Sequence, residues 1–250
     1  YGEPKFKNVI LENLIDVKED GSFKLNMKYF NYATGLTMTN NKFSELFGEP
    51  VRNPKNEKLT QFHMDIAASI QSVTEEIIIK LTKSISAEFK IKNLCLAGGV
   101  ALNCVANGKI LNNKIFENIW VQPAAGDAGG SIGAALSFWF KELGNKRDHY
   151  KDEMSGSFLG PSFSNNRIEK DLKYLNANFD KLEDNELLPK LAKELSQNKI
   201  IGWFQGRMEF GPRALGARSI LANPLSEKMQ RELNLKIKFR DGFRPFAPSV

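Results

Sequence analysis

The chain has 250 residues, of which 42% are hydrophobic and 26% charged, a composition typical of a folded globular protein rather than a disordered one. There are 35 Lys and Arg against 29 Asp and Glu, a net charge of +6, and no basic run is interleaved with stacking aromatics. We therefore expect no nucleic-acid partner, and a small anionic molecule is the better use for any local positive cluster. No stretch of about eighteen apolar residues occurs, so no membrane span is expected.

The two cysteines, Cys95 and Cys104, stand in apolar or small-residue surroundings. Two cysteines at this spacing make neither a disulfide framework nor a paired C-x-x-C metal motif. We expect both thiols to be buried and reduced, in a cytoplasmic protein.

The first third of the chain predicts one strand and two helices. Apolar and polar residues alternate over 22–30 after a turn, which predicts a half-buried strand. Residues 40–47 have the pattern of a short helix, and a Pro- and Asn-containing loop follows over 51–56. The clearest helix runs from about 60 to 89, because its apolar residues recur at helical spacing.

Beyond residue 90, strands and helices alternate. Short apolar strands are predicted at 91–97 and 118–122, and each is followed by a glycine-containing turn. Helices are predicted to follow these turns over 100–111 and from about 131 to 143. This repeated order of strand, glycine turn and helix is typical of an α/β domain.

A change of composition predicts a domain boundary. Charged and small residues dominate from 144 to 166, so one domain is expected over 1–148 and a second over 155–250. In the second domain, 188–197 predicts a helix and 200–204 a strand, after which comes a loop rich in Gly, Arg and Pro.

Two glycine turns are the first candidates for a binding site. Gly98 and Gly99 lie between a strand and a helix, where backbone N–H groups and the partial positive charge of the helix N-terminus suit a phosphate. Tight packing without a ligand would explain such a turn equally well, and Asn103 either bonds a ligand or satisfies a turn. The second turn places Asp127 among small residues, where it could hold a metal or act as a helix N-cap.

Arginine-rich segments are the second kind of candidate. Three arginines stand among turn glycines over 204–220, and basic groups stand beside aromatics over 237–248. The planar guanidinium suits phosphate and carboxylate groups, including carbamate. Either segment alone could be a solvated surface loop, whereas the two together suggest one anion pocket. The histidines, His63 and His149, have no His or Cys partner at ligand spacing and are expected to be structural or solvated.

These motifs resemble the carbamoyltransferase family that includes nodulation-factor and antibiotic O-carbamoyltransferases. The resemblance covers nearly the whole chain, and its two C-terminal motifs are the most specific, because glycine turns are shared with a wider nucleotide-binding superfamily. The matching segments are residues 1–4, 63–71, 98–103, 126–130, 209–216 and 243–248.

The resemblance implies an α/β fold in two parts. The part over 1–148 would be the later portion of a threonylcarbamoyltransferase-like domain of the actin, heat-shock chaperone ATPase and sugar-kinase superfamily. The part over 155–250 would be the start of an α+β, YrdC-like C-terminal domain. The first residue is Tyr1, not Met, so we expect an internal fragment of a longer enzyme, inactive by itself.

The resemblance also implies a reaction. In the family, carbamoyl phosphate is broken down in the YrdC-like domain, the carbamate is adenylated with ATP, and the actin-like domain passes the carbamoyl group from carbamoyl adenylate to a hydroxyl of a small molecule. ATP and a divalent metal, Mg or Fe, are the expected cofactors, and a homodimer is a possible assembly. Departures from the family pattern are Ala217, where Asn is usual, and Asp241, where Glu is commoner; the family's paired metal-binding histidines are absent from this sequence.

The site residues implied by the resemblance fall into three groups. The nucleotide contacts are assigned to Gly98, Gly99, Asn103, Gly129 and Gly130, and the metal ligand is Asp127. Arg213 is the first candidate for the catalytic carbamoyl phosphate pocket, followed by Arg207, Arg218, Lys238 and Arg244.

Three other functions stay open. Another ATP-dependent member of the superfamily, a threonylcarbamoyl-transfer protein or a sugar kinase, would have no role for the Arg213 and Arg244 loops. A non-catalytic nucleotide-binding module would bind ATP but be indifferent to carbamoyl phosphate. A basic interaction fragment would show strong salt-dependent binding to nucleic acid.

Overall fold

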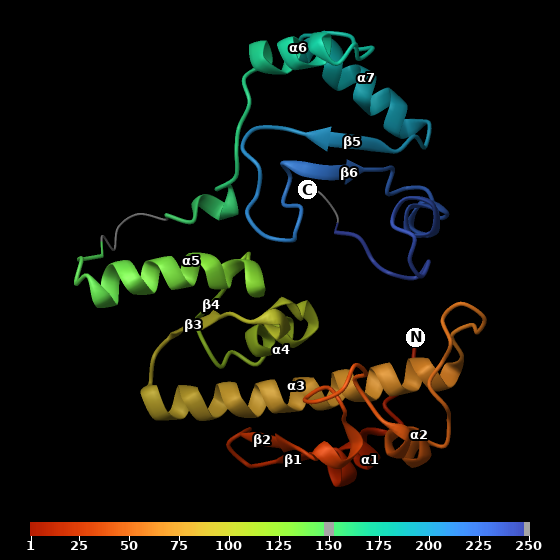
Figure 1. Ribbon diagram of the computed structural model, residues 1–250, viewed down its shortest axis with the longest axis vertical. Helices are drawn as coiled ribbons and strands as arrows, with labels where there is room; N and C mark the ends of the chain where they lie inside the picture. Colours follow the sequence, from red (N-terminus) through yellow and green to blue (C-terminus); the bar gives the residue numbers. More distant parts are fainter. Residues whose placement is uncertain (148–152, 248–250) are drawn as a thin grey trace. The chain divides into compact units, whose positions relative to one another are not determined.

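The computed structural model describes residues 1–147 and 153–247, which form two compact units, Tyr1–Ala125 and Gly126–Val250 (Figure 1). His149 and Pro248 lie outside the described residues. The domain boundary expected between 148 and 155 stays a prediction.

A single long helix, α3 (Gln61–Phe89), runs through the first unit and confirms the helix expected over 60–89. The side chain of His63 closes its first turn, because the Thr60 N–H donates to His63 Nδ1 at 3.1 Å. The Thr60 hydroxyl lies 2.8 Å from the same nitrogen. His63 therefore has the structural role expected of it, satisfying a group at the helix start that would otherwise lack a partner.

On one side of α3 lie α1 (Lys7–Asn13), the strands β1 (Ile15–Val17) and β2 (Phe23–Leu25), and α2 (Asn41–Phe47) (Figure 1). β1 and β2 pair as an antiparallel hairpin. Apolar side chains of this layer and of α3 are buried in one core cluster, which stabilises the unit through the hydrophobic effect. The core side chains are Ile10, Leu14, Ile15, Tyr29, Phe47, Val73 and Ile77.

The strand expected over 22–30 is shorter than predicted. It ends at Leu25, and a 3₁₀ helix follows over Met27–Tyr29. The Asn26 side chain accepts the Lys28 N–H at 3.2 Å, which caps that turn and ends the extended backbone. The short helix expected over 40–47 is confirmed as α2, which Gly48 ends with φ +76°.

The N-terminal segment is bound along α3 through Asp65, which is only 4% exposed. Asp65 Oδ1 accepts the Glu3 N–H at 2.8 Å, and Oδ2 lies 3.0 Å from Lys5 Nζ. One turn later, Ser69 Oγ accepts the Phe6 N–H at 3.0 Å. The backbones approach so closely that a Cβ at Gly2 would lie 2.0 Å from the Met64 carbonyl oxygen. The segments 1–4 and 63–71, which are far apart in the sequence, thus pack against each other.

On the other side of α3 lies a parallel strand pair joined by a helix (Figure 1). β3 (Asn93–Leu96) leads through a 3₁₀ turn, Gly99–Leu102, into α4 (Cys104–Asn112) and then β4 (Asn118–Val121). With α5 (Asp127–Ser137) after β4, the expected α/β rhythm is confirmed.

Two details of this region differ from expectation. The helix expected from residue 100 starts only at Cys104, because the Asn103 side chain caps it and the preceding turn is 3₁₀. Cys95 and Cys104 are exposed rather than buried. Burial alternates along β3, and Cys95 occupies an exposed position while Leu94 and Leu96 are partly buried. Apolar sequence neighbours therefore did not indicate which strand face each residue occupies.

The second unit contains α5, which continues into a π-helical turn over Phe138–Glu142, and the helices α6 (Asn165–Tyr174) and α7 (Asp184–Ser196). α6 and α7 lie on one side of an antiparallel pair, β5 (Ile201–Phe204) and β6 (Arg218–Leu221) (Figure 1). A short helix, α8 (Met229–Glu232), and a π-helical turn over Leu233–Ile237 follow.

Several bounds in this unit differ from the prediction. α5 starts at Asp127 and not near residue 131, so the second glycine turn is helical. α7 starts four residues earlier than expected, where Glu183 and Glu186 form a capping box. α6 and β6 were not predicted, whereas β5 confirms the strand expected over 200–204.

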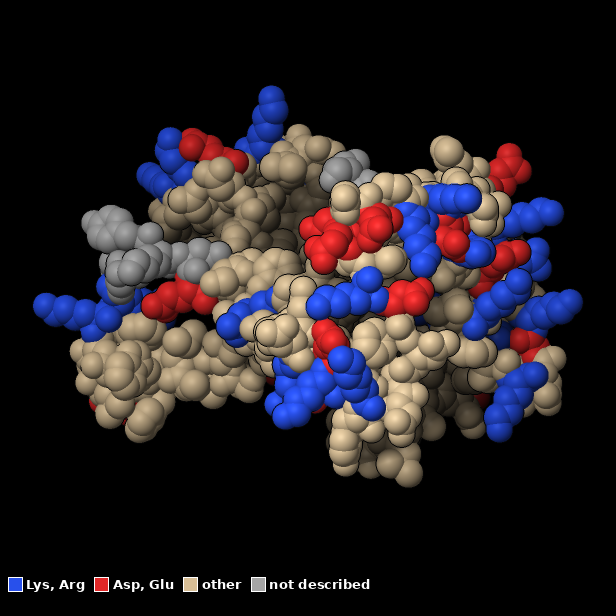
Figure 2. Space-filling view, turned by 90° about the horizontal axis from the view of Figure 1, so that it is seen from above, with Lys and Arg blue, Asp and Glu red and all other residues tan. Residues whose placement is uncertain are grey.

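Over the face drawn in Figure 2, Lys and Arg side chains are interspersed with Asp and Glu. Among the described residues, no helix is both long enough and apolar enough to cross a membrane. Some basic side chains are paired one helical turn away, as in Arg167–Asp171 at 2.7 Å and Lys173–Glu169 at 2.6 Å.

Ile110 and Leu111 are adjacent on α4 but 0% and 55% exposed. Ile110→Ala is expected to lower the free energy of unfolding by about 2–5 kcal/mol, because it leaves a cavity in packed surroundings. Leu111→Ala, the matched control, should change it by less than about 1 kcal/mol. Urea unfolding followed by circular dichroism measures both, and equal effects would contradict the assigned burial.

The pKa of Asp65 lies at about 2, below its ordinary value of 3.8, chiefly because the Glu3 N–H and the Gln61 and Lys5 side chains bond the carboxylate. A lowered pKa stabilises the fold fully above the ordinary value, and this stabilisation is lost as the pH falls towards 2. The difference in unfolding free energy between wild type and Asp65→Asn should therefore be constant above about pH 5 and shrink below pH 4. Asp16→Asn, at an exposed carboxylate, is the control; a difference independent of pH would contradict the prediction.

Candidate functional site

The first glycine turn lies between β3 and the 3₁₀ turn before α4. Gly98 has φ +96°, in the region that favours glycine, and its N–H donates to the Ala125 carbonyl at 2.7 Å. A Cβ built at Gly98 or Gly99 would meet no atom within 4 Å. Packing therefore does not require glycine here, although the backbone of Gly98 does. Contact of Gly98 and Gly99 with a nucleotide phosphate stays a prediction.

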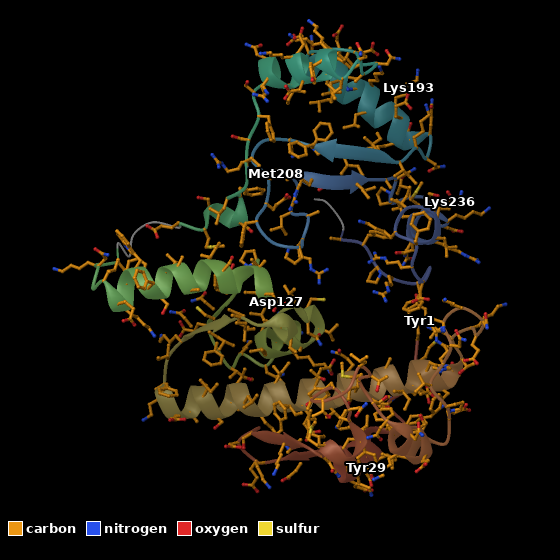
Figure 3. The ribbon with its side chains drawn as sticks, in the orientation of Figure 1. Tyr1, Tyr29, Asp127, Lys193, Met208 and Lys236 are labelled. Carbon is orange, nitrogen blue, oxygen red and sulfur yellow. The ribbon has the colours of Figure 1, made fainter. Side chains whose placement is uncertain are left out.

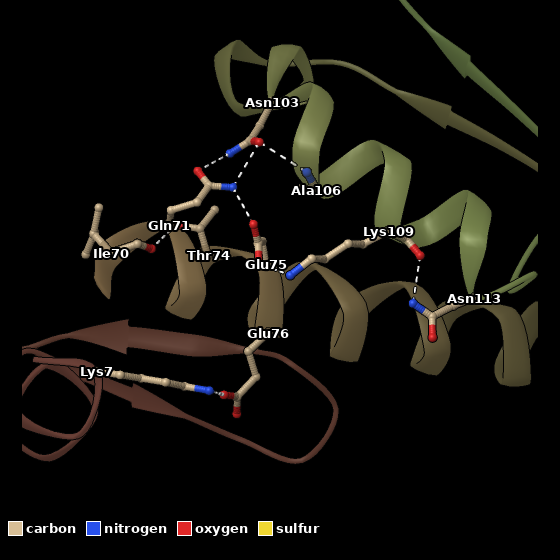
Figure 4. A network of polar contacts seen from close by, with 10 residues as sticks. All are labelled: Lys7, Ile70, Gln71, Thr74, Glu75, Glu76, Asn103, Ala106, Lys109 and Asn113. Carbon is tan, nitrogen blue, oxygen red and sulfur yellow. Dashed lines mark hydrogen bonds and ion pairs between the residues drawn. The ribbon is translucent and has the colours of Figure 1, made fainter. Parts of the chain in front are cut away.

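Asn103, predicted to contact nucleotide, is the N-cap of α4. Its Oδ1 accepts the Ala106 N–H at 3.2 Å and Gln71 Nε2 at 3.1 Å. Its Nδ2 donates to Gln71 Oε1 at 2.9 Å. The two amides form a reciprocal pair between α3 and α4 (Figure 4).

Glu75 holds that amide pair in its orientation. Gln71 Nε2 also donates to Glu75 Oε1 at 2.8 Å, and Lys109 pairs with the other carboxylate oxygen (Figure 4). Burial by itself would raise the pKa of Glu75, but the hydrogen bonds from Lys109 and Gln71 outweigh it and hold the pKa below its usual range. The charged carboxylate orients Gln71, so Asn103 is held in place by groups of this chain. Its role as a nucleotide contact stays a prediction.

The second glycine turn forms the start of α5 in the second unit. Asp127 is the first residue of the helix and is exposed (Figure 3), while Gly129 and Gly130 lie in the same first turn. A carboxylate at this end is stabilised by the helix dipole. Asp127 is not the N-cap of α5, because Gly126 occupies that position, and no side chain caps this helix end. A Cβ at Gly130 would meet no atom within 4 Å.

Within residues 1–147 and 153–247, no group of three or more His, Cys, Asp or Glu side chains could hold a metal ion. Asp127 could contribute one ligand. Mg²⁺ commonly binds one or two carboxylates and takes phosphate and water oxygens for the rest, so one carboxylate fits that metal. The metal assignment of Asp127 stays a prediction.

The arginine-rich loop of the second unit is framed by an earlier segment of the chain. Ser157, 0% exposed, donates its hydroxyl to the Phe210 carbonyl at 2.6 Å and accepts the Phe210 N–H at 2.7 Å through its own carbonyl. The Gly160 N–H donates to the carbonyl of Met208, a residue labelled in Figure 3, at 2.9 Å. Arg207 Nη1 donates to the Gly160 carbonyl at 2.8 Å. Part of the segment expected as a domain boundary is thus bound to the loop.

Glu209 stands in the first half of this loop, and its side chain is 0% exposed. Oε1 accepts the backbone N–H groups of Leu215 at 2.7 Å, Ala217 at 2.8 Å and Arg218 at 3.3 Å. Oε2 accepts Arg218 Nε at 2.9 Å. Burial by itself would raise the pKa of Glu209, but the bonds from Arg218 and the backbone N–H groups outweigh it and hold the pKa at about 2.

The three arginines of the loop have different surroundings. Arg207 is bonded to the frame, and Arg218 lies on β6, where its Nη2 also donates to the Glu209 carbonyl at 3.0 Å. Arg213 is exposed between Pro212 and Ala214, and its guanidinium has no hydrogen-bond or ion-pair partner in the described part of the chain. Anion binding by Arg213, Arg207 and Arg218 stays a prediction.

The second basic segment is held by Asn234, which is 0% exposed. Its Nδ2 donates to the Arg244 carbonyl at 2.7 Å, and its Oδ1 accepts Arg240 Nε at 2.6 Å. The Lys238 and Arg244 side chains are exposed, and their role in an anion pocket also stays a prediction.

Sequence reasoning assigned no role to the residues that hold these candidates in place: Gln71, Glu75, Ser157, Glu209 and Asn234. Glu209 gave a signal, since it is the one carboxylate among three arginines in the segment 204–220. Gln71 ends the motif over 63–71, whereas Asn234 and Ser157 stand in unremarkable surroundings.

Two family models match the chain. One, described as the carbamoyltransferase N-terminus, matches residues 1–136, and the other, described as the carbamoyltransferase C-terminus, matches residues 192–250. The N-terminal match extends past the first compact unit into α5 and includes both glycine turns. The C-terminal match includes both arginine-rich segments.

Three curated relatives each align with the whole chain. An uncharacterised protein of Synechocystis sp. is 59% identical, and the chain spans 41% of its length. Nodulation protein NolNO of Sinorhizobium fredii is 36% identical, with 35% of its length spanned. Nodulation protein NolO of Bradyrhizobium diazoefficiens is 34% identical, with 43% of its length spanned. The chain therefore spans less than half the length of these relatives.

The Asn103–Gln71 pair predicts coupled stability effects. Asn103→Ala should lower the free energy of unfolding by about 0.5–2 kcal/mol through loss of the cap. Gln71→Ala should remove part of the same stabilisation, so the double variant should lose less than the sum, with a coupling of about 0.5–3 kcal/mol. Denaturant unfolding of all four proteins measures this.

The control for that cycle combines Asn103→Ala with Lys42→Ala on α2, which lies across α3 from α4 (Figure 1) and should be additive. Additive behaviour of the Asn103 and Gln71 variants would show that the pair contributes nothing.

Proposed function

The chain belongs to the carbamoyltransferase family, and from this premise we propose that its activity is ATP-dependent O-carbamoylation of a small-molecule hydroxyl. Carbamoyl phosphate is the proposed source of the carbamoyl group, and carbamoyl adenylate the activated form. The observation that supports this best is the Arg213 loop, where an exposed guanidinium stands on a closed, hydrogen-bonded frame.

Each of the two expected domains is proposed to belong to a known fold. Residues 1–148 are proposed to be part of an actin-like nucleotide-binding domain, which the β3–α4–β4 unit and its glycine turn support. Residues 155–250 are proposed to be part of a YrdC-like domain, which the β5–β6 pair and its flanking helices support. A cytoplasmic location and a homodimer remain predictions.

The second unit is proposed to bind carbamoyl phosphate. The Arg213 guanidinium would bond two phosphate oxygens through its planar fork and stabilise the charge on phosphate as it leaves, with Lys238 and Arg244 adding positive charge. Water would then complete the conversion of the carbamoyl group to carbamate. Carbamate is a poor electrophile, so it has to be activated before a hydroxyl can attack it.

The first glycine turn is proposed to bind the nucleotide. ATP supplies an AMP group that converts carbamate to a mixed anhydride with a good leaving group, releasing pyrophosphate. The backbone N–H of Gly99 would bond a phosphate, since the Gly98 N–H already donates to the Ala125 carbonyl. Asp127 is proposed separately, as one oxygen ligand to a divalent metal, Mg or Fe. The acceptor hydroxyl then takes the carbamoyl group and AMP leaves.

Arg213→Ala is expected to weaken carbamoyl phosphate binding by about 10- to 100-fold, since a hydrogen bond to a charged group contributes about 1.5–3 kcal/mol. Titration calorimetry on the 250-residue chain measures the affinity. The matched control is Arg167→Ala, which removes an exposed arginine of α6 paired with Asp171 and should leave the affinity unchanged. Equal affinity for the Arg213 variant and wild type would overturn the proposed pocket.

AMP release from ATP, in the native protein containing this sequence at its full natural length, tests the chemistry. Release that requires carbamoyl phosphate is the expected outcome. Conversion of ATP to ADP would identify a kinase instead, and ATP binding that is indifferent to carbamoyl phosphate would identify a nucleotide-binding module.

A further inference from the structure

The loop between β5 and β6 closes on itself around one carboxylate. Glu209 stands near its start, and the N–H groups that its Oε1 accepts belong to Leu215, Ala217 and Arg218 near its end. Gly211 and Gly216, with φ +107° and +114°, make the reversals that this closure needs. The residues between these glycines, including Arg213, are all exposed.

Arg218 completes the closure from β6. Its Nε donates to Glu209 Oε2 at 2.9 Å, and its Nη2 donates to the carbonyl oxygens of Glu209 at 3.0 Å and Gly211 at 3.4 Å. The guanidinium therefore bonds both the carboxylate and the loop backbone. Arg218 Nε and Nη2 are therefore bonded to groups of the loop.

The closure of the loop also determines which of its arginines is left exposed to bind an anion. A buried carboxylate without partners would attract Arg213 towards itself, because an unpaired buried charge is costly. Glu209 instead has Arg218 and three backbone N–H groups as partners. Its charge is compensated within the frame, so the charge of Arg213 stays directed at the exterior. An arginine on an already ordered loop also loses less entropy when it binds an anion.

We propose that Glu209 is a positioning residue for the anion site: with Arg218 it closes the 209–218 loop and holds Arg213 where it meets the phosphate group of carbamoyl phosphate. This proposal rests on the proposed function. Arg218, predicted as a direct catalytic contact, then acts through Glu209 and the loop backbone.

The test is a double-mutant cycle between Glu209→Gln and Arg213→Ala in the 250-residue chain, read as the dissociation constant of carbamoyl phosphate. In wild type both carboxylate oxygens of Glu209 accept hydrogen bonds from N–H donors. The amide of Gln replaces one of these oxygens with an NH₂ group, which faces the same donors and cannot accept from them, so part of the hydrogen bonding that closes the loop is lost. Glu209→Gln is expected to weaken binding about tenfold or more, as for loss of one charge-assisted bond. In the Arg213→Ala background it should have no further effect, because it acts through Arg213.

Two controls separate positioning from general loss of structure. Glu227→Gln removes an exposed carboxylate of the same unit and should bind like wild type. ATP affinity should be unchanged in Glu209→Gln. If that variant does not fold, Arg218→Lys replaces it, since Lys retains the charge but not the bonds to two backbone carbonyls.

The amide NMR signals of Leu215 and Ala217 give an independent readout, since both should shift when their carboxylate acceptor is lost. If Glu209→Gln binds like wild type while Arg213→Ala binds weakly, the positioning role is overturned and the proposed function stands. If Glu209→Gln weakens binding equally in both backgrounds, it does not act through Arg213, and the positioning role is again overturned. If wild type does not bind carbamoyl phosphate, or Arg213→Ala binds as wild type does, the proposed pocket fails and this inference fails with it.

Discussion

A carboxylate removed from water must be surrounded by donors, and this constraint organises both units of the protein. Asp65 binds the N-terminal segment along α3, Glu75 orients the amide pair between α3 and α4, and Glu209 closes the arginine loop. In each case at least one donor comes from a residue distant in sequence or across a loop. The pKa of each carboxyl is held below its usual range, so each remains charged at neutral pH.

The same constraint separates residues that build the candidate sites from residues that are exposed at them. Asn103 and Arg218 have the side-chain chemistry of ligand contacts, but their polar atoms bond neighbouring groups of the chain. Gly98, Gly99 and Arg213 differ, since open space lies over the glycines and Arg213 is exposed. Side chains that hold the backbone in place and side chains that are exposed therefore stand in the same motif. The motif over 209–216, for example, contains both the buried Glu209 and the exposed Arg213.

Elements with a strong periodic pattern could be predicted from the sequence. The helix α3 and the strands β3, β4 and β5 lie where apolar spacing placed them. β6 could not be predicted, because it starts at Arg218 inside a Gly- and Arg-rich stretch and becomes a strand only through its pairing with β5. The start of α5 was missed for a related reason, since glycines at 126, 129 and 130 have low helix propensity and indicate a loop.

By itself, the sequence determined the α/β rhythm, the two glycine turns, the concentration of arginines and the resemblance to carbamoyltransferases. These features depend on residue type and on spacing along the chain, which can be read without coordinates. Only the tertiary structure decided which polar side chains are already engaged. Glu209 and Arg218 are nine residues apart and look equally available in the sequence, yet both are committed to closing the loop around Arg213. Hydrogen-bond partners depend on how the backbone folds back on itself, and a linear pattern does not contain that information.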